Sequence, residues 1–119
     1  MMEADLGNDL PAVELSDLME ICQGGPYVGN LAIDGIGFGP RKFLDKFIET
    51  EDSVFVSEFK RGFFKSGFRL LRVNRSDMSE HILIKSGEYI EPKSLSNGKL
   101  FYRENTFSDS ERSLELDLL

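Results

Sequence analysis

Two stretches in the first half of the chain place apolar residues at helical spacing. The first is residues 14–22, where one helix face would carry Leu15, Leu18, Met19 and Cys22, at i, i+3, i+4 and i+7. Gly24 and Gly25 then offer a left-handed stop, and Pro26 prevents continuation. The pattern predicts a short amphipathic helix in which Cys22 is a buried small hydrophobe.

The second stretch is residues 40–52. Its apolar residues stand at i, i+1, i+4 and i+5, which is also helical spacing: Phe43, Leu44, Phe47 and Ile48. Pro40 suits the first turn of a helix. Residues 27–34 lie between the two stretches and read as a short strand weakened by Gly29. We therefore expect a second helix after this strand.

From Ser53 onward the pattern changes to short runs of β-prone residues separated by turn signals. The runs are 53–59, 68–74, 81–85, 88–91 and 99–104. Asn97-Gly98 is the strongest turn signal, because both residues tolerate the positive φ of a type I′ hairpin. Residues 113–119 alternate leucine with acid and predict a half-buried strand, with a terminal helix as the alternative.

This order of elements predicts an α+β fold. Two short helices in the N-terminal half would pack on one face of a mainly antiparallel sheet of four to six strands. The length of 119 residues indicates a single domain spanning 1–119, with residues 1–10 prone to fraying.

Charge adds a feature that the hydrophobic pattern does not contain. The formal net charge is −7, and the first forty residues carry seven acids with no Lys or Arg. The remaining residues carry fourteen acids and fourteen Lys plus Arg, so the whole net charge lies in the first third. Phosphates would be repelled there, which disfavours nucleic acid or an anionic membrane as its partner. A basic protein is the partner that this third suits.

The acidic third also supplies the predicted binding residues. Three acids fall on the exposed face of the first predicted helix, one lies in the following loop, and a tyrosine adds an aromatic anchor: Glu14, Asp17, Glu20, Asp34 and Tyr27. Opposed charge between partners raises association rates by roughly 10 to 1,000-fold. We expect these five residues to form the partner-binding surface.

The glycines at 35, 37 and 39 raise the question of a phosphate site. Their spacing is G-x-G-x-G, so the third glycine comes one residue early for a dinucleotide fingerprint. Pro40 removes an N–H donor, and Pro-Arg-Lys replaces the Lys-Ser or Lys-Thr of a P-loop. We expect no cofactor and read the stretch as a turn that places Ile36 and Phe38 in the core. A small-ligand regulatory site on this turn is a lesser hypothesis.

A basic-aromatic segment at 59–75 provides an alternative function. It contains no acid, and its Lys and Arg residues interleave with phenylalanines, as in proteins that stack bases beside phosphate contacts. His81, the single histidine, could serve a ribonuclease-like site with nearby Glu and Arg. The bland interpretation is a hairpin with a Phe-lined inner face and a solvated basic outer face. The basic residues could also balance the acidic first third within the fold.

Residue counts and the spacing of residues argue against several kinds of site and against two cellular locations. Cys22 is alone, so the chain offers no disulfide and no cysteine-based metal site, and the histidine and acids lack metal-ligand spacing. The first ten residues are acidic with no apolar run after them, unlike a secretory signal, and no window is long enough for a membrane span. The cytoplasm is the simplest location.

The profile is similar to that of small bacterial immunity proteins and other proteinaceous inhibitors, by size and charge rather than by motif. That similarity implies a non-enzymatic, cytoplasmic domain that blocks a basic toxin or nuclease through a negative surface. A nucleic-acid-binding or ribonuclease-like domain is the alternative. The sequence leaves open the partner, the strand order and the oligomeric state.

Overall fold

The computed structural model describes residues 12–62, 66–106 and 110–116, and these residues form strands and turns with no helix. The ten strands are β1 Val13–Glu20, β2 Tyr27–Ile33, β3 Ile36–Leu44, β4 Ile48–Glu49, β5 Ser53–Arg61, β6 Ser66–Asn74, β7 Glu80–Gly87, β8 Glu91–Ser96, β9 Lys99–Arg103 and β10 Arg112–Glu115. All pairings are antiparallel. One sheet has the order β1-β2-β3-β5-β6-β7, with β4 beside β5, and the other has the order β10-β9-β8.

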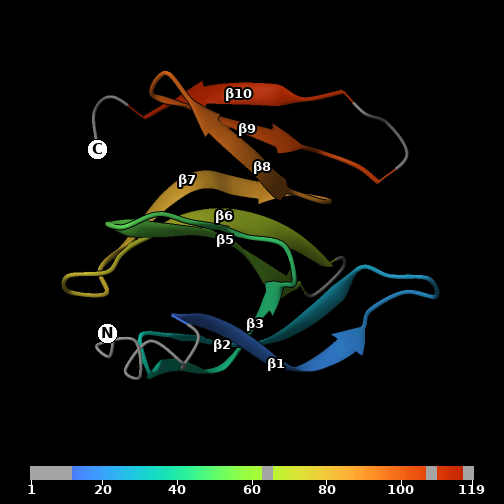
Figure 1. Cartoon of the computed structure of the whole chain (residues 1–119). Helices are drawn as coiled ribbons and strands as arrows, with labels where there is room; N and C mark the ends of the chain where they lie inside the picture. Colours follow the sequence, from blue (N-terminus) through green and yellow to red (C-terminus); the bar gives the residue numbers. More distant parts are fainter. Residues whose placement is uncertain (1–11, 63–65, 107–109, 117–119) are drawn as a thin grey trace, which may run out of the picture.

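The strands form three layers (Figure 1). β1 and β2 make one outer layer, β5 and β6 the middle, and β8–β10 the other outer layer. β3 joins the first two layers, since it pairs with β2 along most of its length and with β5 only at Lys42–Phe59 and Phe43–Glu58.

Two hydrophobic cores fill the spaces between the layers. The first core consists of Val13, Leu31, Ile33, Phe43, Val54, Val56, Leu71 and Val73. The second core consists of Val28, Leu44, Phe55, Phe68, Leu70, Ile90, Leu100 and Tyr102. Successive residues of β5 and β6 alternate between the two cores because side chains alternate across a strand. The middle layer is therefore buried on both faces.

The first predicted helix is wrong, because residues 13–20 form β1. Val13 and Leu15 pack on the first core while Glu14 and Ser16 face solvent, which is a two-residue period. A β-bulge then places Asp17 and Leu18 opposite Gly29 of β2. The bulge shifts the phase of the strand and creates the three- and four-residue spacings that imitated a helix. Cys22 is correspondingly exposed, in the turn after β1.

The second predicted helix is also wrong, since residues 40–52 contain the end of β3, a turn and β4. Phe43 packs in the first core and its neighbour Leu44 in the second. After the turn, Phe47 packs against the first core and Ile48 against the second. The pairs of adjacent apolar residues thus result from burial on both sides of the chain, and not from one apolar face of a helix. The fold is all-β rather than α+β.

The glycine stretch begins with a hairpin turn. Asp34 and Gly35 have φ of 50° and 83° and connect the paired residues Ile33 and Ile36, as in a two-residue type I′ turn. Ile36 is 51% exposed, contrary to the expectation that the turn buries it. Phe38 is half-buried against the first core, with its ring edge-on to Phe43 at 5.9 Å.

The C-terminal half agrees better with the sequence pattern. Asn97 and Gly98 have φ of 53° and 74° between the paired residues Ser96 and Lys99, which confirms the predicted hairpin. β10 confirms a strand at 112–115, with Leu114 and Leu116 half-buried against the second core. The fraying expected of residues 1–10 and the last residues of the predicted tail strand lie outside the described residues.

A group of charged side chains lies beside the first core. Glu58 of β5 is 2% exposed, and its carboxylate accepts hydrogen bonds from Arg41 at 3.0 and 3.1 Å and from Arg69 at 2.9 Å. Arg41 also donates twice to Glu80 of β7, at 2.8 Å each. Burial raises the pKa of Glu58, but the two arginines outweigh it and hold that pKa below its ordinary 4.5. Arg41 thus links β3, β5 and β7.

Candidate functional site

Three of the five predicted binding residues lie in β1, at the edge of the larger sheet, and Tyr27 begins β2 opposite Glu20. β1 pairs only with β2 among the described strands, so no described strand covers its outer edge. Glu14 is exposed near the start of the strand, where it pairs with Ala32 of β2, and its carboxylate has no hydrogen bond or ion pair among the described residues. Six residues separate Glu14 from Glu20, which is about 20 Å along a strand. The acids therefore form a row along an edge, not one face of a helix.

Asp17 and Glu20 both have partners. Asp17, with a φ of 53°, accepts from the Asn30 amide at 3.0 Å, and that amide oxygen accepts from Lys42 at 2.6 Å. Glu20 accepts from the Gly24 backbone N–H at 2.8 Å and from the Tyr27 hydroxyl at 3.1 Å. The bond to Glu20 raises the pKa of Tyr27. Glu20 and Tyr27 thus hold the turn between β1 and β2.

Asp34 lies apart from Glu20 and Tyr27. It follows β2 at the end of the hairpin where β1 begins, and its carboxylate accepts from Arg75 at 2.6 and 3.1 Å. Arg75 also binds Glu49 at 3.0 Å, and its hydrogen bonds to Asp34 lower the pKa of that carboxyl. The structure therefore groups Asp17, Glu20 and Tyr27 and leaves Asp34 at the far end, already paired.

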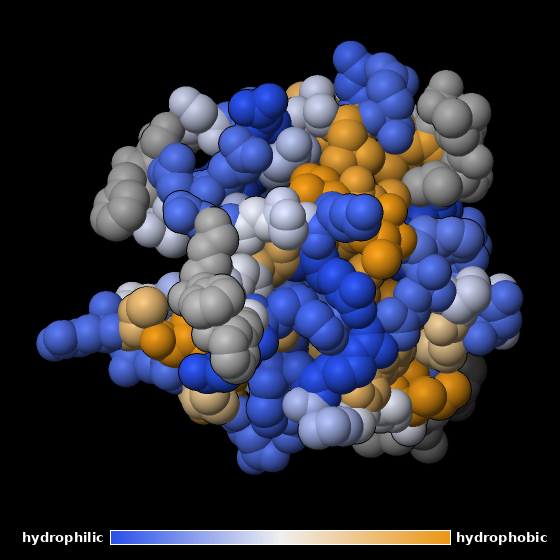
Figure 2. All heavy atoms as spheres, turned by 180° about the vertical axis from the view of Figure 1, so that it is seen from behind, coloured by the Kyte–Doolittle hydropathy of each residue, from blue (hydrophilic) through white to orange (hydrophobic). Residues whose placement is uncertain are grey.

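Leu18 and Met19, which the helical interpretation placed on the apolar face, are exposed near the β1 edge together with the predicted anchor Tyr27. Leu18 is 51% exposed, Met19 41% and Tyr27 42%. Leu18 lies over Gly29, which has no side chain to occupy that space. The β1–β2 turn projects from the rest of the molecule in Figure 1, and hydrophobic atoms lie among hydrophilic ones on the projecting arm at the left of Figure 2. Asp17 and Glu20 adjoin this apolar group in the chain.

The basic segment 59–75 is largely engaged within the fold. Arg69 bonds Glu58, Arg72 donates to the Ser53 hydroxyl at 3.0 Å, and Arg75 bonds the acids described above. The rings of Phe59 and Phe68 pack 5.3 Å apart in or against the second core. The antiparallel pairing of β5 with β6 and the packed phenylalanines agree with the bland interpretation, but Arg69, Arg72 and Arg75 are bonded within the fold and do not form a solvated basic face. Phe63, Phe64 and Lys65 lie outside the described residues.

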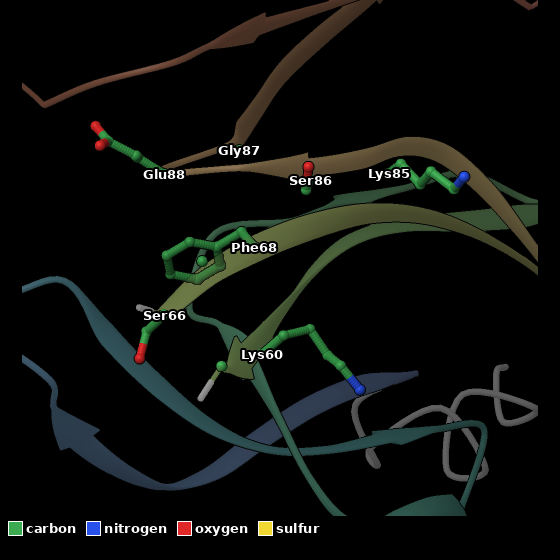
Figure 3. Close-up of a pocket in the computed structure, with 9 residues that line it drawn as sticks. Lys60, Ser66, Phe68, Lys85, Ser86, Gly87 and Glu88 are labelled. Carbon is green, nitrogen blue, oxygen red and sulfur yellow. The ribbon is translucent and has the colours of Figure 1, made fainter. Parts of the chain in front are cut away.

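A cavity of about 240 Å³ lies beside Phe68, between β6 and β7 (Figure 3). Lys60 and Lys85 line it together with Ser66 and Ser86, a combination that could hold an anion. Their side chains do not converge, however, and the lysines extend away from the Phe68 ring in Figure 3. This arrangement does not build an anion site.

The remaining candidate chemistry is dispersed. His81 is exposed on β7, with its Nε2 3.4 Å from the Asn74 amide nitrogen, while its neighbour Glu80 bonds Arg41. The described part of the chain contains no group of three His, Cys, Asp or Glu side chains placed to hold a metal ion. It also contains no helix with the length and apolarity of a membrane span.

Comparison with known proteins yields no relative: no family model matches the chain, and neither a curated protein nor a solved structure was found similar to it.

Proposed function

We propose that this chain is a non-enzymatic protein-binding domain whose contact surface is the β1 edge. The partner is a basic protein, in the most concrete form a toxin or nuclease that the domain blocks as a bacterial immunity protein in the cytoplasm. The observation that carries the proposal is the exposed apolar group Leu18, Met19 and Tyr27 set among Glu14, Asp17 and Glu20. The proposal extends the expectation from sequence, with a strand edge in place of a helix face.

The two kinds of side chain would play different parts in binding. Exposed leucine, methionine and tyrosine bury well against a partner, and a few such residues carry most of the binding energy of an interface. The acids would attract a basic surface and set the rate of encounter. β1 contains no Lys or Arg to oppose that attraction. Its eight residues span about 23 Å.

Partner capture followed by association kinetics tests the proposal. The full chain captures its partner from the native cell, and the purified pair is then measured at 50 and 200 mM salt. We expect the double variant E14K/D17K to slow association at least tenfold at low salt, and L18A to speed dissociation about tenfold. The matched control is E51K/D52K, which makes the same charge change at exposed residues before β5.

Two results would contradict the proposal. One is a partner that is acidic or is nucleic acid. The other is an E14K/D17K variant that associates at the same rate as E51K/D52K, because long-range charge and not the β1 edge would then explain the effect.

A further inference from the structure

A groove opens where β3 and β5 diverge. The two strands pair only at Lys42–Phe59 and Phe43–Glu58, and the residues before Lys42 and after Phe59 separate. The space between them has a volume of about 380 Å³. Four of its lining side chains are basic, two from each strand: Arg41, Lys42, Lys60 and Arg61.

The groove has little negative charge of its own. Glu58 is the acid that lines it, and its buried carboxylate is already bonded to Arg41 and Arg69. Arg41 is likewise neutralised by Glu58 and Glu80. The charge left over belongs to the three other basic residues of the lining.

These three side chains lack a counter-ion among the described residues. The Lys42 ammonium donates to the neutral amide oxygen of Asn30. Lys60 and Arg61 are exposed, and neither side chain makes a hydrogen bond or an ion pair within the described part of the chain. Figure 3 shows the Lys60 side chain leaving β5 on the side away from Phe68. Three positive charges therefore border one open groove.

Apolar contacts accompany this charge. Met19, 41% exposed, and Pro40 also line the groove. The Arg61 guanidinium lies 5.5 Å from the centre of the Phe59 ring, a distance at which a cation is attracted to the face of an aromatic ring. This contact favours a fixed position for the Arg61 head beside the groove. A ligand with both carboxylates and apolar side chains matches such a lining.

We propose that the groove between β3 and β5 binds an acidic segment of a partner protein, with Lys42, Lys60 and Arg61 contacting its carboxylates. A nucleic acid fits less well, because Phe59 packs against Phe68 and offers no free ring for base stacking. The groove shares Met19 with the β1 edge, but its basic residues lie on β3 and β5 and its ligand has the opposite charge, so variants at Lys60 and Arg61 test the groove without changing the acids of β1.

Fluorescence anisotropy with a labelled hexapeptide of alternating glutamate and leucine tests this site. At 25 mM salt we expect saturable binding to the full chain and at least tenfold weaker binding to K60E/R61E. The neutral variant K60Q/R61Q should weaken binding at least threefold, which guards against an effect of misfolding in the charge-reversed protein. The matched control K99E/R112E reverses two exposed charges on the three-stranded sheet and should change affinity less than twofold.

Four results would overturn the proposal. They are absence of saturable binding to the full chain, equal weakening in K99E/R112E, equal or tighter binding of a thymidine hexanucleotide, and binding of the peptide only after residues 1–11 are deleted. The last result would identify the groove's occupant as the chain's own acidic start, with Glu3, Asp5 and Asp9, and not a partner.

Discussion

Leu18 lies directly over Gly29, and the fit leaves no room for a side chain at position 29. A Cβ there would lie 2.8 Å from the Leu18 Cδ2 and 2.5 Å from the carbonyl oxygen of Ser16. The glycine that weakened the strand prediction is thus the residue that admits the bulge of β1. The exposed position of Leu18 depends on it.

Replacing Gly29 with alanine should therefore destabilise the protein. A backbone oxygen at 2.5 Å cannot move without shifting β1, so we expect a loss of about 2 kcal/mol or more, in the range of overpacked sites. Urea denaturation measures the change. Gly37→Ala is the control, because an added Cβ there meets nothing within 4 Å. Equal stability of the two variants would show that β1 does not pack on Gly29 in this way.

Arg41→Met should cost about 3 kcal/mol, because it removes a partner from the buried carboxylate of Glu58. It should also change the pH dependence of stability. The pKa values of Glu58 and Glu80 are lowered in the folded protein, so the unfolded chain takes up protons first as pH falls. Their contribution is present above pH 4.5 and is lost as pH falls through 4.5 toward the folded values.

The measurement is the free energy of unfolding from pH 7 to pH 3 for both proteins. We expect the stability of the wild type to fall more steeply below pH 4.5 than that of the Arg41→Met variant. Parallel profiles would mean that Arg41 does not set the pKa of either carboxyl.

Two buried serines of β5 should respond oppositely to alanine. The Ser57 hydroxyl is buried without a hydrogen-bond partner among the described residues, whereas the Ser53 hydroxyl accepts from Arg72 at 3.0 Å. Ser57→Ala should leave stability unchanged or raise it by up to about 1 kcal/mol. Ser53→Ala should lower stability by about 1 kcal/mol. Thermal unfolding compares them, and a marked loss in Ser57→Ala would reveal a hidden partner for that hydroxyl.

The two tyrosine–glutamate pairs should differ in strength. Tyr89 donates to the buried carboxylate of Glu91 at 2.7 Å, and burial followed by this bond raises the pKa of Tyr89 well above its usual range. Tyr89→Phe leaves that carboxylate short of a donor and should cost about 1 to 2 kcal/mol. Tyr27→Phe removes an exposed bond to Glu20 and should cost less than Tyr89→Phe. Chemical denaturation tests the order, which the reverse ranking would contradict.

The conformation of a tight turn could be predicted from the sequence, whereas the pairing of strands could not. Asn97-Gly98 was recognisable because the positive φ of a type I′ turn is a property of those two residues alone. Asp34-Gly35 has the same turn signal, but the spacing of the neighbouring glycines also resembles that of phosphate-binding loops. The bulge at Asp17 depends on the strand opposite it, and the adjacent burial of Phe43 and Leu44 depends on two cores. Neither the opposing strand nor the second core can be recognised from the residues of one strand alone.

The same distinction applies to the candidate binding surface: its composition could be predicted, and its arrangement could not. The acidity of the first third is a matter of composition and is visible in the sequence. The distribution of that charge is not, because Asp34 is paired with a residue 41 positions away. An alternation of Val13 and Leu15 with Glu14 and Ser16 was the one signal that could have identified β1. It would have placed Leu18 and Met19 in an irregular stretch, where exposure is ordinary.

The two-sided burial of β5 and β6 bears on how the molecule unfolds. Phe55, Phe68 and Leu70 would become solvent-exposed if the three-stranded sheet detached, and Val54, Val56 and Leu71 would if β1 and β2 did. Losing either outer layer thus removes support from strands that the other layer needs. The outer layers should therefore unfold in one cooperative transition, with the slowest amide exchange in β5 and β6. A fragment that ends before β8 would present an apolar sheet face and would be prone to aggregate.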